Sequence, residues 1–134
     1  MKIREFMTTK VEFVDAGGSV YDAVEKMVDR RIRSVAVRLK EKNNSYGVIT
    51  ARDVVYKVLS KGMDPRSTKA SEIASKPIVC VEKDIAVLAA AEVMEKSKIA
   101  RVFVREGEKI VGVVSLLDIM SAALIMRARG DHVS

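Results

Sequence analysis

A short stretch of this chain occurs twice, and the duplication limits which folds the sequence can adopt. Residues 47–53 and 112–118 each run from a glycine through two β-branched residues to a hydroxyl residue, with an aspartate three positions further on. In both copies, the apolar run after the glycine is typical of a strand, and the apolar spacing after the hydroxyl residue is typical of a helix. Each copy therefore predicts a strand that leads directly into the start of a helix.

The similarity between the two halves extends well beyond these seven positions. Residues 19–28 correspond to 86–95, residues 33–37 to 100–104, and residues 11–14 to 78–81. The sequence thus predicts an α+β fold of sandwich-like type, in which two pseudo-symmetric βαββα repeats pack into one compact module. We expect repeat 1 at residues 1–62, a linker at 63–69 that contains Pro65, and repeat 2 at residues 70–130.

Hydrophobic periodicity and turn residues locate the elements of each repeat. In repeat 1 we expect a helical lead-in at 3–7, strands at 11–14, 34–37 and 46–50, and helices at 20–30 and 51–61. In repeat 2 we expect a lead-in at 70–74, strands at 78–81, 101–104 and 110–115, and helices at 86–97 and 116–129. A polar hairpin loop is expected at 41–44 and a frayed tail at 130–134, and Gly62 is expected to end its helix as a C′ residue.

The composition indicates an aliphatic core and a cytoplasmic location. Of the 134 residues, 49% are hydrophobic but only 4% are aromatic, so the core should consist of aliphatic side chains. Cys80 is the only cysteine, which excludes an intramolecular disulfide and favours a reducing compartment. We expect no signal peptide and no membrane span, because no apolar run approaches the ~20 residues that a spanning helix needs. The absence of glutamine from a highly charged chain is compatible with a thermophilic source.

The motifs Thr50-x-x-Asp53 and Ser115-x-x-Asp118 have two interpretations. A hydroxyl residue followed by a carboxylate at a helix start is close to a capping box, which needs no ligand. A helix start also presents free N–H groups to a phosphate, and an aspartate there can accept two hydrogen bonds from a ribose diol. The occurrence of the motif at equivalent places in both repeats favours a ligand site, without excluding a purely structural cap.

The tandem βαββα unit that ends in glycine, two apolar residues, Ser or Thr, and Asp three positions later resembles a pair of cystathionine β-synthase (CBS) domains, also called a Bateman module. The resemblance covers essentially the whole chain. It implies a sensor that binds AMP, ADP, ATP, S-adenosylmethionine or NAD in clefts between the repeats. It also implies pairing of two copies into a homodimer and an unidentified effector protein that responds to the ligand.

The resemblance assigns residues to two clefts. In the first, Thr50 and Asp53 would face ribose and phosphate, Ser75, Ile78 and Val79 would contact the base, and Arg101 and Arg52 would reach phosphate. The equivalent second cleft would use Thr8, Val11, Glu12, Arg33, Ser115 and Asp118. Leu117 stands where the first cleft has Arg52, so the first cleft is the better-charged one. The bound adenine nucleotide would be a ligand, and no catalytic cofactor or metal is implied.

Three other functions compete with nucleotide sensing. The sequence argues against an enzyme, because His132 is the only histidine and stands in the tail, and Cys80 has no nearby base in the sequence. Nucleic-acid binding is suggested by the net charge of +6 and the basic residues at 30–33, but no aromatic stacking platform or recognition helix supports it. A pure oligomerisation scaffold remains an alternative, against which the intact Thr50–Asp53 and Ser115–Asp118 motifs argue.

Overall fold

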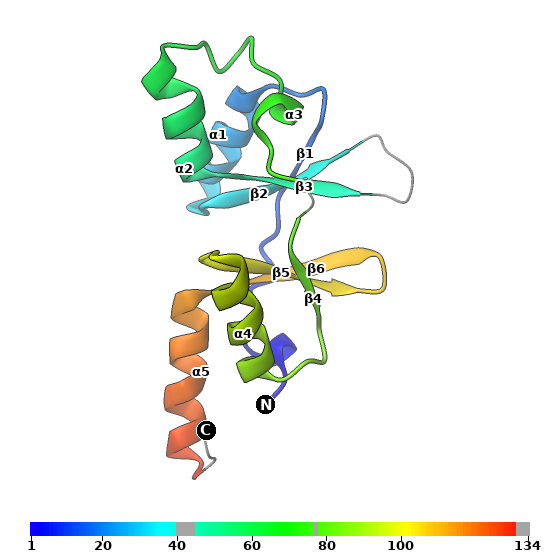
Figure 1. The fold of residues 1–134 in the computed structure, drawn as a ribbon, viewed down its shortest axis with the longest axis vertical. Helices are drawn as coiled ribbons and strands as arrows, with labels where there is room; N and C mark the ends of the chain where they lie inside the picture. Colours follow the sequence, from blue (N-terminus) through cyan, green and yellow to red (C-terminus); the bar gives the residue numbers. More distant parts are fainter. Residues whose placement is uncertain (40–44, 77, 131–134) are drawn as a thin grey trace. The chain divides into compact units, whose positions relative to one another are not determined.

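The computed structural model describes residues 1–39, 45–76 and 78–130, which form two compact units (Figure 1). Unit 1 combines Met1–Val11 with the chain from Val79 onward, and unit 2 is Glu12–Ile78. The predicted hairpin loop at 41–44 and His132 in the predicted tail lie outside the described residues.

Unit 2 contains a three-stranded mixed sheet in the order β1-β2-β3. Its strands are β1 (Phe13–Asp15), β2 (Ser34–Arg38) and β3 (Tyr46–Thr50), with β1 parallel and β3 antiparallel to β2. Its helices are α1 (Val20–Arg30), α2 (Ala51–Lys57), the 3₁₀ turn η2 (Leu59–Lys61) and α3 (Ala70–Ile73). Figure 1 shows α1 and α2 on the same face of the sheet.

The core of unit 2 lies between this sheet and its helices. Successive residues of a strand point to opposite faces, so Ile49 faces the helices while its neighbour Thr50 does not. Apolar residues spaced along one side of α1 pack against the same face. The buried cluster includes Val20, Ala23, Met27, Val35, Val37, Ile49, Val54 and Val58.

Unit 1 repeats the same arrangement. Its sheet has the order β4-β5-β6, formed by β4 (Cys80–Glu82), β5 (Arg101–Glu106) and β6 (Lys109–Ser115). β4 is parallel and β6 antiparallel to β5. The helices are α4 (Val87–Ser97) and α5 (Leu116–Ala128), together with the 3₁₀ turn η1 (Ile3–Glu5). The α+β class and the two-repeat architecture predicted from the sequence are therefore confirmed.

The compact units exchange their lead-in segments relative to the sequence repeats. Ile3, from the start of repeat 1, is fully buried in the core of unit 1, and its N–H donates to the carbonyl oxygen of Ile85 at 2.9 Å. Conversely, Ala70 and Ile73, from the start of repeat 2, join the core of unit 2. The core of each unit is thus completed by the segment that precedes the other repeat in the sequence.

The main local difference from the predicted elements lies at the end of α2, expected to extend to residue 61. The regular helix ends at Lys57, with Val58 at φ −118° as its C-cap, and a 3₁₀ turn follows. Gly62 then adopts the predicted left-handed conformation at φ +68°. Its N–H donates to the carbonyl of Leu59 and that of Met63 to Val58, the hydrogen-bond pattern of a Schellman motif.

The edge strands also differ slightly from the prediction. β1 and β4 each begin two residues later than expected, at Phe13 and Cys80.

Over the described ranges, no helix has the combination of length and apolar character that crossing a bilayer requires.

Candidate functional site

Thr50 and Asp53 form a closed hydrogen-bonded ring where β3 leads into α2. The backbone N–H of Thr50 donates to Oδ2 of Asp53 at 2.9 Å, and the N–H of Asp53 donates to Oγ1 of Thr50 at 3.1 Å. This is the capping box that the spacing predicts. The Asp53 side chain is only 14% exposed, so its carboxylate is held at a defined position at the end of the strand.

Lys57, one helical turn beyond Asp53, is a member of this site that the sequence interpretation missed. Its Nζ lies 3.1 Å from Oδ1 of Asp53 and donates to the carbonyl oxygen of Ile73 at 3.0 Å. The i,i+4 spacing of a carboxylate and a lysine on a helix is the signal that could have identified the first contact. The second contact joins α2 to the end of α3.

Ser75 and Ile78 lie beside β3 in the same unit. Val48 and Ser75 exchange two backbone hydrogen bonds, at 3.0 and 2.9 Å, and the N–H of Ile78 donates to the carbonyl of Tyr46 at 3.0 Å. The segment around Ser75 can lie close to β3 because Gly47 has no side chain. A Cβ at Gly47 would lie 3.0 Å from the carbonyl oxygen of Ser75.

Five residues of the first predicted set therefore share unit 2. They are Thr50, Asp53, Ser75 and Ile78, with Arg52 exposed on α2.

Unit 1 contains the equivalent arrangement around Asp118. Its Oδ2 accepts hydrogen bonds from the N–H of Ser115 at 2.8 Å and from Oγ of Ser115 at 3.0 Å. Thr8 and Val113 exchange two backbone hydrogen bonds, beside Gly112. Thr8, Val11, Ser115 and Asp118 of the second predicted set thus share unit 1. The position that corresponds to Lys57 is occupied by the buried Ala122.

The remaining predicted residues belong to the other unit in each case. Val79 and Arg101, assigned to the first set, lie in unit 1, where Arg101 is the strand partner of Ser115. Glu12 and Arg33, assigned to the second set, lie in unit 2, where the carbonyl of Arg33 accepts from the N–H of Ala51 at 2.9 Å. Their predicted roles beside residues of the other unit stay predictions.

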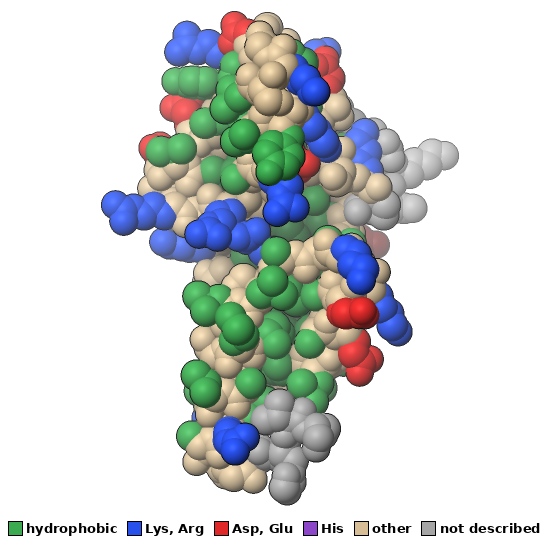
Figure 2. Space-filling model, turned by 60° about the vertical axis from the view of Figure 1, so that its left-hand side comes forward, with side chains coloured by type: hydrophobic (Ala, Val, Ile, Leu, Met, Phe, Trp, Pro, Cys, Tyr) green, Lys and Arg blue, Asp and Glu red, His purple; other side chains and the backbone are tan. Residues whose placement is uncertain are grey.

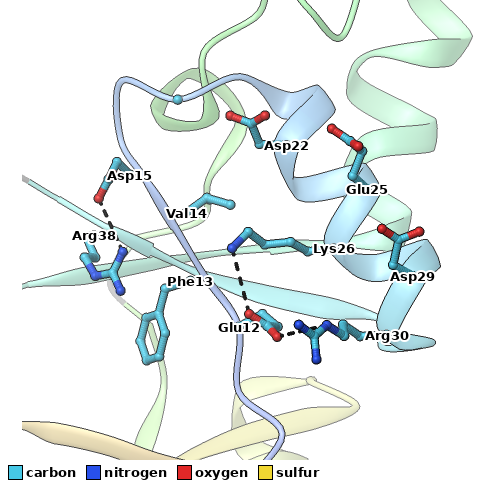
Figure 3. A pocket seen from close by; sticks show the side chains of 11 residues that line it. Glu12, Phe13, Val14, Asp15, Asp22, Glu25, Lys26, Asp29, Arg30 and Arg38 are labelled. Atoms are coloured by element: carbon cyan, nitrogen blue, oxygen red, sulfur yellow. Dashed lines mark hydrogen bonds and ion pairs between the residues drawn. The ribbon is translucent and has the colours of Figure 1, made fainter.

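Glu12 also borders an open hollow in unit 2, with a volume of about 480 Å³ (Figure 3). Lys26 Nζ lies 3.8 Å from Oε2 of Glu12, and Arg30 Nε lies 3.4 Å from Oε1. The hollow is lined by residues of β1, α1, the turn between them and Arg38, and Thr50, Asp53 and Ser75 are not among them. It is therefore separate from the Asp53 arrangement.

Cys80 shows no sign of activation as a nucleophile. Burial raises the pKa of its thiol, with the Arg105 cation opposing that shift and the Glu82 carboxylate adding to it. The thiol is thus held in its protonated, weakly nucleophilic form at neutral pH.

Proteins of similar sequence and solved structures of similar fold are known for this chain. An uncharacterised protein of Methanopyrus kandleri is 37% identical over 111 residues, which cover 80% of this chain and 56% of that protein. This chain thus spans little more than half the length of that relative. Among solved structures, a hexameric CBS-CP12 protein from bloom-forming cyanobacteria matches with a TM-score of 0.87 and 28% identity, over 99% of this chain and 77% of the other.

A second solved structure has a comparable fold at lower identity. A CBS domain protein from Pyrobaculum aerophilum, complexed with AMP, matches with a TM-score of 0.81 and 20% identity, over 96% of this chain and 99% of the other. The sequence model of the CBS domain matches this chain twice, at residues 3–60 and 70–125. The chain therefore belongs to the CBS domain family, of which it contains a tandem pair.

Proposed function

We propose that this CBS-domain pair is a regulatory module that binds an adenosine-containing nucleotide, with AMP favoured over ADP and ATP. The observation that carries the proposal is the Asp53 carboxylate, which is held in place by Thr50 and joined through Lys57 to the segment before Ser75. The same carboxylate arrangement recurs around Asp118 in unit 1. The AMP bound to the Pyrobaculum aerophilum protein supports this choice of ligand.

The ribose is the part of the ligand that Asp53 would recognise. An ionised carboxylate offers about four lone-pair positions, of which the N–H of Thr50 and the ammonium of Lys57 occupy two. Two positions remain for the 2′- and 3′-hydroxyl groups of a ribose. Each hydrogen bond to a charged acceptor contributes about 1.5–3 kcal/mol where water is excluded, so the diol would provide much of the affinity.

The base and the phosphate would be bound by the remaining residues of each set. Ser75 and Ile78 would contact adenine together with Val79, and Arg52 and Arg101 would neutralise the phosphate. Thr8, Val11, Glu12, Arg33, Ser115 and Asp118 would form the equivalent second site. S-adenosylmethionine and NAD contain the same adenosine group and are the alternative ligands.

Regulation would follow from a difference in affinity between conformations. A ligand shifts a conformational equilibrium only by as much as it binds one state better than the other. The output would pass to an effector protein in the cytoplasm, and the module itself would not be an enzyme.

Two copies of the chain would pair through α2 and α5. Figure 2 shows hydrophobic side chains gathered on the part of unit 1 that carries α5. Leu117, Met120 and Leu124 of α5 are 66%, 58% and 73% exposed, and Val55, Tyr56 and Leu59 of unit 2 are also exposed. Exposed apolar residues that gather on one helix, as on α5, are typical of protein interfaces.

The substitution Asp53→Ala tests the nucleotide proposal. We expect it to weaken AMP binding at the first site at least about tenfold, because the ribose diol loses its acceptor. Asp22→Ala is a matched control, because Asp22 closes an equivalent capping box with Ser19 on α1 and is not among the predicted site residues. Isothermal titration with AMP, ADP, ATP, S-adenosylmethionine and NAD gives the affinity and the stoichiometry.

Comparison of the two substitutions separates an effect on helix capping from an effect on nucleotide binding. If both substitutions lower the affinity for AMP equally, the effect comes from lost helix capping and the proposed role of Asp53 is wrong. If none of the five ligands binds the unaltered chain below millimolar concentration, the scaffold alternative replaces the sensor.

A further inference from the structure

We propose that Lys57 is a positioning residue for the Asp53 site, a role that rests on the nucleotide-binding function proposed above. Its ammonium group contacts both Oδ1 of Asp53, at 3.1 Å, and the carbonyl oxygen of Ile73, at 3.0 Å. These two atoms belong to the two chain segments that carry the predicted ribose and base contacts of this unit. Lys57 therefore holds the two halves of the site at a fixed separation.

The Ile73 carbonyl is available to Lys57 because of its place in the fold. Ile73 is the last residue of the four-residue helix α3, and the final carbonyl groups of a helix have no acceptor role within it. Its side chain is 5% exposed and packs in the core of unit 2. Two residues further along, Ser75 is hydrogen-bonded to Val48 of β3. A cation bound to the carbonyl of Ile73 is thus attached to a segment that packs in the core of unit 2 and pairs with β3.

The contact of Lys57 with Oδ1 determines the plane of the Asp53 carboxylate. The N–H of Thr50 holds Oδ2, which still allows the group to rotate about that anchor. Because Lys57 holds Oδ1 as well, both oxygens are directed, as bidentate recognition of a diol requires. Lys57 does occupy one acceptor position of Oδ1, but two positions of the carboxylate remain, so its orienting effect outweighs its competition with the ligand.

The second repeat provides an internal comparison. Asp118 has the same capping box as Asp53, but the residue four positions later is Ala122, which supplies no ammonium group. The two sites should therefore respond differently to changes at this helix position. The pairing of Lys57 with Asp53 is therefore a feature of the first repeat and is not part of the duplicated motif.

The experiment compares two nucleotides in variants that retain only the first site. In the full chain carrying Asp118→Ala, Lys57→Met should lower the affinity for AMP about three- to tenfold. This is the expected cost when one side chain at a binding site is no longer held in place. Binding of 2′-deoxy-AMP should change less than twofold, because it lacks one of the two hydroxyl groups. Lys57→Arg retains a cation and should restore most of the preference for AMP. Lys61→Met, an exposed lysine of η2, is the control.

Each outcome of these calorimetric titrations has a defined meaning. If AMP does not bind the unaltered chain, the proposed function fails, whatever Lys57 does. A second outcome is that AMP binds but Lys57→Met leaves the ratio of the AMP and 2′-deoxy-AMP affinities unchanged. In that case Lys57 does not position Asp53, whether the two affinities both fall or both stay the same. If Asp118→Ala does not fold, the same substitutions in the otherwise unaltered chain, fitted to two sites, give the same comparison.

Discussion

Arg31 and Lys98 adopt a backbone conformation that usually favours glycine. Their φ angles are +54° and +55°, and they follow α1 and α4 at equivalent positions of the two repeats. At each position the N–H donates three residues back, and the next residue donates five residues back, as in a Schellman motif. A side chain at such a position is strained, so these helix ends are less stable than they could be.

Lys98→Gly should therefore stabilise the protein by about 0.5–1 kcal/mol, because relief of the strain outweighs the extra freedom of glycine in the unfolded chain. The ion pair that is lost, with Glu95 at 3.9 Å, is exposed and contributes little. Chemical denaturation measures the change in the free energy of unfolding. As a control, Lys96→Gly within α4 should destabilise the protein by a similar amount. A destabilised Lys98→Gly variant would contradict the argument.

The aspartates show how far a local motif can predict a site. The spacing of hydroxyl and carboxylate correctly predicts capping boxes at Thr50 and Ser115. However, the same box forms between Ser19 and Asp22, neither of which is a predicted ligand contact, so capping alone does not identify a binding site. Lys57 could be anticipated as a neighbour of Asp53 from its spacing, but not as a partner of Ile73, because that contact depends on tertiary packing.

At the scale of elements, β3 and β6 depend on glycines that let another segment approach. A Cβ at Gly47 would lie 3.0 Å from the carbonyl oxygen of Ser75 and 3.1 Å from Cβ of Ala74. Gly112 has the same relation to Thr8, at 3.0 Å from its carbonyl oxygen. The duplicated glycine is thus required by the segment that packs beside the strand, and not by the turn of the chain itself.

Gly47→Ala should destabilise the protein by about 1–3 kcal/mol, because the added methyl group must displace backbone that is hydrogen-bonded to Val48. Hydrogen exchange at the amide of Ser75 should also become faster. Gly17→Ala is the control, since a Cβ at Gly17 has no neighbour within 4 Å. Equal stability of the two variants would show that the close approach is not needed.

Element boundaries were predictable where the sequence itself sets them. The predicted α1 and β3 have the observed bounds, because a Ser19 cap and a regular pattern of apolar residues mark them. β1 begins later than predicted because its extent depends on parallel pairing with β2, through Phe13 and Ala36. Such pairing brings together residues far apart in the sequence, which local periodicity does not record.

At the scale of the whole molecule, the apolar surface of α5 is larger than its own unit can bury. Its helical sequence is apolar over more than one face, and only Ala122 and Met126 among its residues are buried. Leu117, Met120 and Leu124 face outward instead. Burying such side chains against a second copy would be favourable by about 25 cal/mol per Å² of apolar area.

Leu124→Glu should convert a dimer into a monomer, because a charge in an apolar interface loses its hydration without gaining a partner. Light scattering coupled to size-exclusion chromatography measures the mass. Val28→Glu makes the same change at an exposed apolar residue of α1 and should leave the mass unaltered. A monomeric unaltered chain, or a dimeric Leu124→Glu chain, would exclude pairing through α5.

The exchanged lead-in segments have a practical consequence for anyone who wishes to study half of this protein. A gene fragment that starts at residue 70 would encode most of unit 1 without Ile3, and would leave a hole where that side chain belongs. A fragment that stops at residue 62 would lack Ala70 and Ile73 in the same way. A fragment that contains one whole compact unit would instead begin at Glu12 and stop at Ile78. The best boundaries for a fragment therefore lie inside the sequence repeats and not in the linker between them.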